Sequence, residues 1–320
     1  MNPRLGVAAR GGFTLAELLV TLVLLGIVLG AVVGVLSRQQ RFYGSAADLM
    51  ETRGRLRQAL AVLPSDIRAM SPSDTLSGGA NSGDVYAWSD HAIEFRSVLG
   101  SSVVCWVTGL APLTSLRLPP VGLPNVLTSW QTTPVAGDSL LIFDNSALRW
   151  RAYAITALAP VSAGAGCPSG AGQFLTAAQA ALSSYAVSVA PALSATIRAG
   201  APVRVFRRVH YELYQETDGR WYLGFFDCLS TYVPAGCRAL EPVSGPYRPY
   251  STTPGLSGLL FTYFDSTGAV LNPGVAQARA IARIELTVRA QTQAPMSLSG
   301  GARVMGKDSV RYTIGLRNRH

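Results

Sequence analysis

The sequence predicts an α+β protein in which a long N-terminal helix packs on an antiparallel β-sheet head. Two observations predict this fold. An apolar run in the first 70 residues passes without a proline into a stretch with helical spacing, and strand-like runs fill much of the chain after residue 71. The chain therefore divides into four expected segments: a leader at 1–12, a membrane-spanning half of the helix at 13–36, an amphipathic half at 37–70 and a β-rich head at 71–320.

The first half of the helix is apolar and long enough to cross a membrane. Residues 18–36 form a run of nineteen residues without a charged side chain. As a helix this run measures about 28 Å, close to the thickness of the hydrocarbon core, and it exceeds the roughly 7–15 apolar residues of a cleavable signal peptide. The short leader carries Arg4 and Arg10 and no acidic residue. A basic leader predicts a cytoplasmic N-terminus and a head outside the cytoplasm.

One acidic residue, Glu17, lies inside this apolar segment. A carboxylate in a membrane helix is energetically expensive, so its presence needs a reason. Cleavage between Gly12 and Phe13 supplies one, because Phe13 then begins the helix with a free ammonium group. Glu17 follows four residues later on the same helix face. There the helix dipole favours the carboxylate, which is able to pair with an ammonium group of its own chain or of a neighbouring subunit.

The residues around this position resemble a known processing motif. Residues 10–17, Arg-Gly-Gly-Phe-Thr-Leu-Ala-Glu, are similar to the prepilin cleavage and methylation motif of type IV pilins and type II secretion pseudopilins. The resemblance implies that prepilin peptidase cuts after Gly12 and methylates the Phe13 amine, and that Glu17, the fifth mature residue, sets the register with the next subunit. Ala16 differs from the Ile or Leu that is commoner there. The alternative is a plain signal anchor with a chance glutamate.

The resemblance also implies a location and a set of partners. The precursor is expected in the bacterial inner membrane as a single-pass protein, with its N-terminus in the cytoplasm and its head in the periplasm. After cleavage it is expected to enter a filament or a filament tip. Other pilins or pseudopilins and the inner-membrane assembly platform are the expected partners, and the fold expected on this basis is pilin-like.

Three glycines, Gly26, Gly30 and Gly34, recur every four residues in the apolar run. They share one helix face and permit close contact with another helix. One interpretation is a packing seam, or a stretch that loosens as subunits leave the membrane. The other interpretation is that glycine is simply common in membrane helices.

The helix is expected to continue beyond the membrane. Residues 37–63 contain no proline, and apolar residues recur there at helical spacing with charged residues on the opposite face. Such an amphipathic stretch packs one face on a globular head. Pro64 is a candidate kink, after which residues 65–70 add a last turn. The apolar residues of the expected face are Phe42, Ala46, Leu49, Met50, Leu56, Leu60 and Leu63.

The head is predicted to be an antiparallel sheet with one wet face, because several strand-like runs alternate between apolar and polar residues. Asp218-Gly219 predicts a hairpin turn, since this pair supplies the positive φ angles that the turn needs. Residues 159–200 are rich in Ala, Ser and Gly and are expected to form a short helix near 177–185 or a loose excursion. The expected strands are 92–98, 102–107, 139–143, 148–155, 203–214, 221–226, 258–264, 281–288 and 309–316.

Four cysteines in a chain expected outside the cytoplasm predict two disulfides. Cys228 and Cys237 are close in the sequence and are expected to pair across a short loop, which leaves Cys105–Cys167. Four cysteines allow three pairings, and buried free thiols are the remaining alternative. The cysteines form no C-x2-C pair, so a zinc site is not expected.

The sequence contains no P-loop, G-x-S-x-G, H-E-x-x-H or glycine-rich dinucleotide motif. His91 and His210 lie singly on expected strands and are predicted to be surface or lining residues. Asp84, Asp138 and Asp144 lie at strand ends or in loops, where Asp favours turns, and no D-x-D-x-D cluster marks a calcium site. We therefore expect a protein that is not an enzyme and has no metal or cofactor. An enzyme tethered by a pilin-like anchor is the alternative.

The second half of the chain resembles the larger minor pilins and pseudopilins called PilW-like and PulJ/GspJ-like. The resemblance lies in loose strand and turn patterns at 200–213, 255–265, 282–289 and 316–318. Together with a length of 320 residues, it favours a minor subunit of a type IV pilus-type filament. Two alternatives are a type II secretion pseudopilin and a DNA-uptake pilin, whose basic head, in a chain of net charge +9, would bind DNA.

Overall fold

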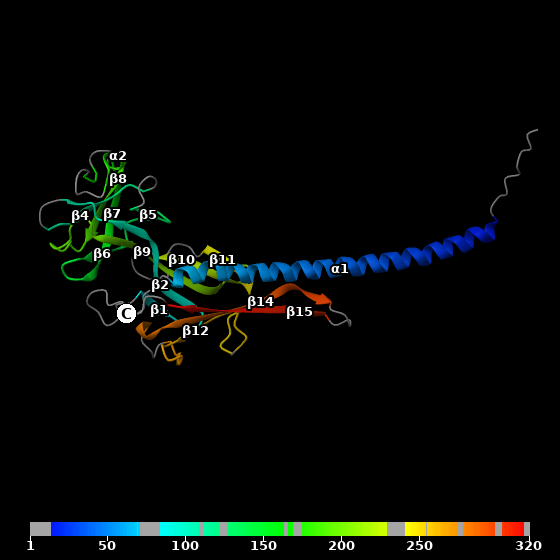
Figure 1. Ribbon diagram of the computed structural model, residues 1–320. Helices are drawn as coiled ribbons and strands as arrows, with labels where there is room; N and C mark the ends of the chain where they lie inside the picture. Colours follow the sequence, from blue (N-terminus) through cyan, green and yellow to red (C-terminus); the bar gives the residue numbers. More distant parts are fainter. Residues whose placement is uncertain are drawn as a thin grey trace, which may run out of the picture. The chain divides into compact units, whose positions relative to one another are not determined.

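The computed structural model confirms the α+β class, since one long helix precedes strands that form antiparallel sheets (Figure 1). The described chain forms two compact units. One contains α1 as far as Thr52 together with residues 292–306, and the other contains residues 53–291 and 307–320. The residues that the structure describes are 14–68, 70, 84–108, 112–121, 127–162, 166–168, 175–228, 241–253, 255–273, 278–297 and 303–316.

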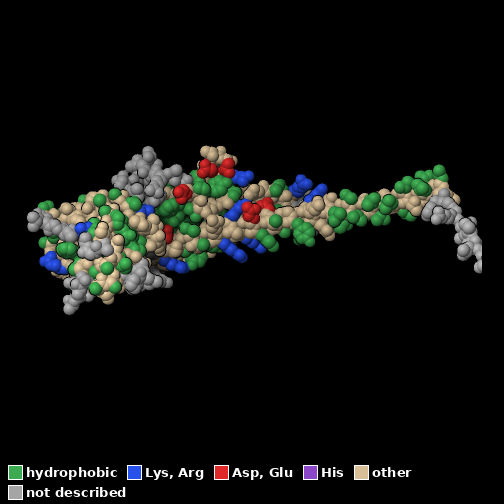
Figure 2. Space-filling view, turned by 90° about the horizontal axis from the view of Figure 1, so that it is seen from above, with side chains coloured by type: hydrophobic (Ala, Val, Ile, Leu, Met, Phe, Trp, Pro, Cys, Tyr) green, Lys and Arg blue, Asp and Glu red, His purple; other side chains and the backbone are tan. Residues whose placement is uncertain are grey.

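Helix α1 (Leu15–Arg68) is continuous and close to the expected range of 13–70. It contains no proline before Pro64, and it continues through that residue to Arg68, although Pro64 has no N–H to donate to the carbonyl of Leu60. Side chains of residues 15–36 are exposed within the chain. Figure 2 shows the surface of this part of α1 as hydrophobic side chains and backbone.

The expected apolar face of α1 is buried over only part of its length, which corrects the prediction for Phe42 and Met50. These two side chains are 67% and 72% exposed. Met50 lies about 120° around the helix from Leu56, so both cannot face the same core. The buried apolar residues of this part of the chain are Leu56, Ala59, Leu63, Ile67 and Met70, while Ala46, Leu49 and Leu60 are half-buried.

Eleven described strands form the larger sheet, in the order β1-β2-β9-β6-β7-β8-β4-β3, with antiparallel neighbours. β9 is the central strand of this sheet. One edge of β9 pairs with β2 over nearly its whole length, and the other edge pairs first with β6 and then with β10. β11 pairs with β10, and β5 pairs with β2. The strands are β1 (Val85–Trp88), β2 (Ala92–Val103), β3 (Trp106–Thr108), β4 (Ser115–Leu118), β5 (Ser129–Trp130), β6 (Ser139–Asp144), β7 (Arg149–Val161), β8 (Ser184–Ala190), β9 (Pro202–Gln215), β10 (Trp221–Cys228) and β11 (Glu241–Tyr247).

The smaller sheet has the order β13-β12-β14-β15. Its strands are β12 (Leu259–Phe264), β13 (Val270–Leu271), β14 (Arg283–Ser297) and β15 (Arg303–Gly315). Two short helices complete the described elements: α2 (Ala177–Ala180) and the 3₁₀ helix η1 (Ala278–Ala280).

Two hydrophobic cores hold the second unit together. In the first, Leu56, Leu63 and Ile67 of α1 pack with residues of both sheets, among them Phe95 of β2 and Leu286 of β14. The second core lies among β4, β6, β7, β8 and the first half of β9, and α1 contributes nothing to it among the described residues. Alternation along β2 and β9 explains the first core, because Ile93, Phe95, Val209, Tyr211 and Leu213 fall on one face of the sheet.

The hairpin turn at Asp218-Gly219 is confirmed, although Gly219 has a positive φ angle and Asp218 does not. β9 and β10 pair in antiparallel register across it, and Gly219 has φ +78°, a conformation that glycine adopts without strain. The backbone N–H of Glu216 donates to the carbonyl of Arg220 at 2.9 Å and closes the turn.

Residues 159–200 are more regular than expected, and the predicted 102–107 strand is split. β7 extends to Val161, α2 has only four residues, and β8 pairs with both β7 and β4. β8 was missed because four of its seven residues are Ser or Ala, which weakens the apolar–polar alternation; its buried residues are Ser184, Val187 and Val189. Residues 102–107 contain the end of β2 and the start of β3, with a break at Val104 and Cys105.

A disulfide joins Cys105 and Cys167, the pair that the sequence analysis leaves after the short loop is assigned. Both residues are buried in a small cluster with Leu175. Cys237 and the side chain of Cys228 lie outside the described residues, so a bond between them stays a prediction.

The first core predicts how two substitutions on one helix will differ. Leu63→Ala removes a side chain with no exposed surface and should lower the free energy of unfolding by about 2–5 kcal/mol. Met50→Ala, at a position 72% exposed, should change it by about 0.5 kcal/mol or less. Chemical unfolding of the full chain in detergent, followed by near-UV circular dichroism, measures both. Equal effects of the two substitutions would contradict the assignment of the core.

Asp66, near the end of α1, predicts a pH dependence of stability. Its Oδ2 accepts a hydrogen bond of 2.9 Å from the hydroxyl of Tyr211. Burial raises the pKa of Asp66 above its ordinary 3.8. Hydrogen bonds from Tyr211, Ser65 and Ser97 lower this pKa, but their effect is smaller than that of burial. The protonated form is therefore favoured in the folded state, and the stability that it provides is lost as the pH rises through the raised pKa.

Asp66→Asn should remove this loss, because an amide keeps an acceptor for Tyr211 and carries no charge. We expect the variant to gain melting temperature relative to the wild type at pH 7, and to gain less below pH 4. Thermal unfolding at a series of pH values tests this. A difference between the two proteins that does not change with pH would show that Asp66 is not responsible.

Candidate membrane-anchor and assembly site

The first turn of α1 is closed by a reciprocal pair of side chains, Thr14 and Glu17. The backbone N–H and the hydroxyl of Thr14 both donate to Oε2 of Glu17 at 3.0 Å. The backbone N–H of Glu17 donates to the hydroxyl oxygen of Thr14 at 3.3 Å. Thr14 immediately precedes the helix, so this is a capping box that satisfies two of the N–H groups that a helix start leaves unpaired.

Thr14 is the residue of this site that the sequence analysis missed. The signal was present, because Thr-x-x-Glu before an apolar run is the pattern of a capping box. Glu17 was instead interpreted only through an ammonium partner. Both bonds from Thr14 end on Oε2, which leaves Oε1 able to accept a hydrogen bond from another donor. Gly12 and Phe13 lie outside the described residues.

After this turn, α1 presents an apolar surface that its own chain does not cover. α1 is long and apolar enough to cross a membrane, and it lies near the N-terminus. Residues 15–36 extend about 33 Å along the axis, a little more than a hydrocarbon core. Glu17 is the one charged residue among them. A surface of this length and composition requires lipid or other helices around it.

No other described part of the chain packs on the glycine row, which consists of Gly26, Gly30 and Gly34. A Cβ atom placed on Gly26, Gly30 or Gly34 would meet no atom within 4 Å. The chain itself therefore gives no reason for glycine at these positions. A packing seam would take its partner from another chain, and the other interpretation, the general frequency of glycine in membrane helices, needs no partner.

Aspartates in the head that were predicted to serve turns are buried in ion pairs. Asp138 accepts two hydrogen bonds of 2.7 Å from the guanidinium group of Arg207. Asp144 accepts from Arg151 at 2.7 Å and from the hydroxyl of Thr196 at 2.6 Å. Hydrogen bonds, first that of Thr196 and then that of Arg151, hold the pKa of Asp144 well below its usual range. Both carboxylates also bind the backbone of adjacent turns as predicted, since Asp144 accepts from the N–H groups of Ser146 and Ala147 at 3.0 and 3.1 Å and Asp138 accepts from that of Val135 at 2.8 Å. Their burial in ion pairs was not predicted.

His210 is also buried, at 4% exposure, which corrects its prediction as a surface or lining residue. Its ring lies 3.0 Å from the carboxylate of Glu212 and 3.8 Å from that of Glu94. Burial lowers the pKa of His210, but the hydrogen bonds and charges of Glu212 and Glu94 outweigh burial and raise it. Among the described residues, no group of three His, Cys, Asp or Glu side chains is placed to hold a metal ion.

Three arginines of the head are held in pairs with buried carboxylates. Arg207 and Arg151 contact Asp138 and Asp144, and the guanidinium group of Arg208 donates to Glu94. Arginines that are held against buried carboxylates are not available to contact a phosphate backbone. Each pair takes up one positive and one negative charge, so the net charge of +9 is the same with or without these pairs.

The comparisons with known proteins agree with the N-terminal site. Residues 8–33 match the family model described as "Prokaryotic N-terminal methylation motif". Comparison with curated proteins and with solved structures gives no match. The matched motif indicates a type IV pilin-like or pseudopilin substrate of prepilin peptidase, with a structural role. Together with the long apolar helix, it indicates a membrane anchor.

The capping box makes a prediction about the first turn of α1. Thr14→Val removes the hydroxyl and keeps the side-chain shape, so it should cost about 1 kcal/mol of local stability and speed amide exchange in this turn about fivefold. Thr21→Val is the matched control, because the Thr21 hydroxyl donates only to the carbonyl of Leu18, at 2.9 Å. Hydrogen exchange of the mature chain in micelles, read by mass spectrometry, compares them. The same exchange in wild type and Thr14→Val would contradict the cap.

Proposed function

We propose that this chain is a minor pilin-like structural subunit of a type IV pilus-type filament. One observation carries the proposal: the methylation-motif match at residues 8–33 coincides with a carboxylate fixed in the first turn of an exposed apolar helix. Neither feature alone is as informative. Together they provide a peptidase substrate, a membrane anchor and a polar contact at the end of a helix that needs neighbours.

Processing precedes assembly in this proposal. Prepilin peptidase cleaves after Gly12 and methylates the amine of Phe13, which becomes the first residue of the mature chain. Arg4 and Arg10 of the leader keep the N-terminus in the cytoplasm, so the chain crosses the inner membrane once and the head lies in the periplasm. Cleavage removes these charges and leaves an apolar helix that is able to move from lipid into a filament.

Assembly in this proposal uses the helix and its first turn. Glu17 offers Oε1 to the N-terminal ammonium group of a neighbouring subunit, while Oε2 keeps its bonds to Thr14. The glycine row at Gly26, Gly30 and Gly34 allows a neighbouring helix to approach closely. The partners are other pilins or pseudopilins and the inner-membrane assembly platform.

The subtype rests on the resemblance of the second half of the chain to PilW-like minor pilins and on its length. A type II secretion pseudopilin would have the same anchor and first turn, and neighbouring genes for pilus retraction or for secretion distinguish the two. A DNA-uptake pilin would bind DNA through arginines of the head other than those paired with Asp138, Asp144 and Glu94, and DNA retention by the head across a salt series tests this alternative.

Glu17→Ala tests the proposed assembly contact. Cleavage after Gly12 and membrane insertion should continue, since the scissile bond is unchanged and the span becomes more apolar. Incorporation into filaments should fall about tenfold, because a neighbour's ammonium group would be left among packed helices without a counter-charge. The measurement is the ratio of tagged protein in sheared filaments to that in the inner membrane, with N-terminal peptide masses recorded for both.

Thr21→Val, one turn further along the same helix, is the control and should be incorporated like the wild type. Wild-type incorporation of Glu17→Ala would refute the role of Glu17 in register. A chain that retains Met1 in a strain with active prepilin peptidase would refute the processing step, and with it the proposed function.

A further inference from the structure

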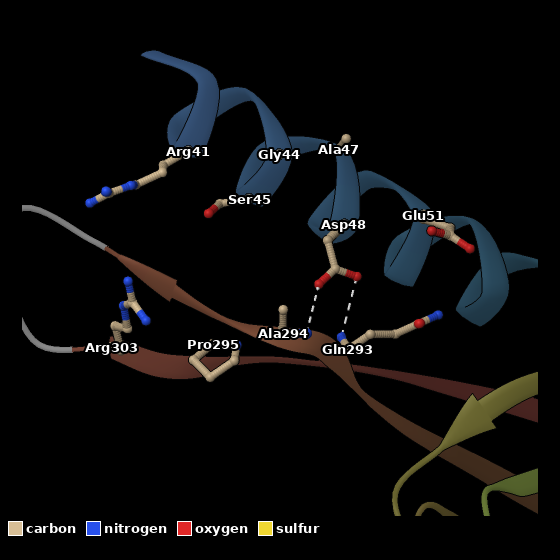
Figure 3. A pocket seen from close by; sticks show the side chains of 10 residues that line it. All are labelled: Arg41, Gly44, Ser45, Ala47, Asp48, Glu51, Gln293, Ala294, Pro295 and Arg303. Atoms are coloured by element: carbon tan, nitrogen blue, oxygen red, sulfur yellow. Dashed lines mark hydrogen bonds between the residues drawn. The ribbon is translucent and has the colours of Figure 1, made fainter. Parts of the chain in front are cut away.

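A groove lies within the first unit, between α1 and the end of the β14–β15 hairpin (Figure 3). Its volume is about 570 Å³, and residues 41–51 of α1 form one wall. Gln293, Ala294 and Pro295 of β14 and Arg303 of β15 form the other. The proposed assembly contact at Glu17 does not involve this groove.

Asp48 fixes the two walls against each other. Its carboxylate oxygens accept hydrogen bonds from the backbone N–H groups of Gln293, at 3.3 Å, and Ala294, at 3.2 Å. The hairpin is itself tightly packed, because a Cβ atom on Gly306 would lie 2.3 Å from the Met296 side chain. The groove is therefore formed before any ligand arrives, and its Asp48 carboxylate is already occupied.

The charges of the groove are separated along its length. Figure 3 shows the side chains of Arg41 and Arg303 at the end nearer the start of α1, and Asp48 and Glu51 further along the helix. Arg41 and Arg303 are both exposed, and neither has an ion-pair or hydrogen-bond partner among the residues that the structure describes. Two guanidinium groups from different elements thus face one end of the groove, and the carboxylates of Asp48 and Glu51 lie further along it. Such an arrangement matches an anion, and a phosphate group above all.

The position of this basic end along α1 identifies the source of the phosphate. If residues 15–36 span the membrane, as the proposed function requires, Arg41 lies about 8 Å beyond the last apolar residue. The headgroup region extends about 5–8 Å beyond the hydrocarbon core. Phe42 and Tyr43, both exposed, lie about 9–11 Å beyond the last apolar residue, just outside the headgroup region. The arginine end of the groove is therefore at the level of lipid phosphates.

We propose that Arg41 and Arg303 bind the phosphate group of an anionic phospholipid in the leaflet beside the head. The two guanidinium groups hold the phosphate from the helix side and from the hairpin side. Asp48 and Glu51 exclude a second anion from the far end of the groove. Bound lipid would fix the depth and the rotation of α1 before the subunit leaves the membrane. This inference rests on the membrane anchor of the proposed function and adds a lipid ligand to it.

The test uses the mature full-length chain in detergent micelles, titrated with phosphatidylglycerol or phosphatidylcholine and read by native mass spectrometry. We expect phosphatidylglycerol to remain bound at lower concentration than phosphatidylcholine. Arg41→Gln and Arg303→Gln should each weaken phosphatidylglycerol binding about fivefold, and the double variant about 25-fold. Arg57→Gln is the matched control, because Arg57 is an exposed arginine of α1 that does not line the groove. It should bind like the wild type.

Several results would overturn the proposal. They are unchanged binding by both groove variants, an equal loss in Arg57→Gln, and displacement of the lipid by equimolar glycerol phosphate, which would indicate a site for free phosphate. A dimer that forms in place of the lipid adduct and is lost in the groove variants would assign the groove to a second copy. Failure of the membrane anchor is separable, since a chain that carbonate extracts from native membranes would refute the proposed function instead.

Discussion

The structure depends on a helix whose first part is not covered by any other described part of its chain. Residues 15–36 expose apolar side chains over about 33 Å, and none of the residues that the structure describes buries them. Lipid or neighbouring helices must do so, and this requirement gives a reason for each feature around the span. Under the proposed function, the basic leader orients the segment, the first-turn cap completes its backbone bonds, and the glycine row leaves room for a neighbour.

The same helix has a different role after Arg53, where it becomes part of a core. Leu56, Leu63 and Ile67 are fully buried with side chains of both sheets, and Asp66 is bound by Tyr211. α1 therefore joins an anchor to a folded head without an intervening linker. Within the head, the buried carboxylates of Asp138 and Asp144 bind arginines of neighbouring strands, Arg207 of β9 and Arg151 of β7.

Sequence reasoning predicted most of what depends on local pattern and missed what depends on distant partners. The helix, the Asp218-Gly219 hairpin and most strands of the head follow from periodicity and turn residues. β8 was missed because Ala and Ser dilute its alternation. Burial of Asp138 was not predictable, since its partner Arg207 is 69 residues away and meets it only once β6 pairs with β9. Thr14 did have a local signal, which the search for a charged partner for Glu17 obscured.

The cap changes how a glutamate inside an apolar segment is understood. A bare carboxylate in lipid is costly, and an ammonium partner from another subunit is available only after assembly. The N–H and hydroxyl of Thr14 donate to Oε2 of Glu17 within the single chain. A subunit that has not yet assembled therefore already has one oxygen of this carboxylate hydrogen-bonded. Oε1 remains able to accept a bond from a neighbour's ammonium group. Under the proposed function, assembly therefore adds a partner to Glu17 without breaking the first turn of the helix that carries it.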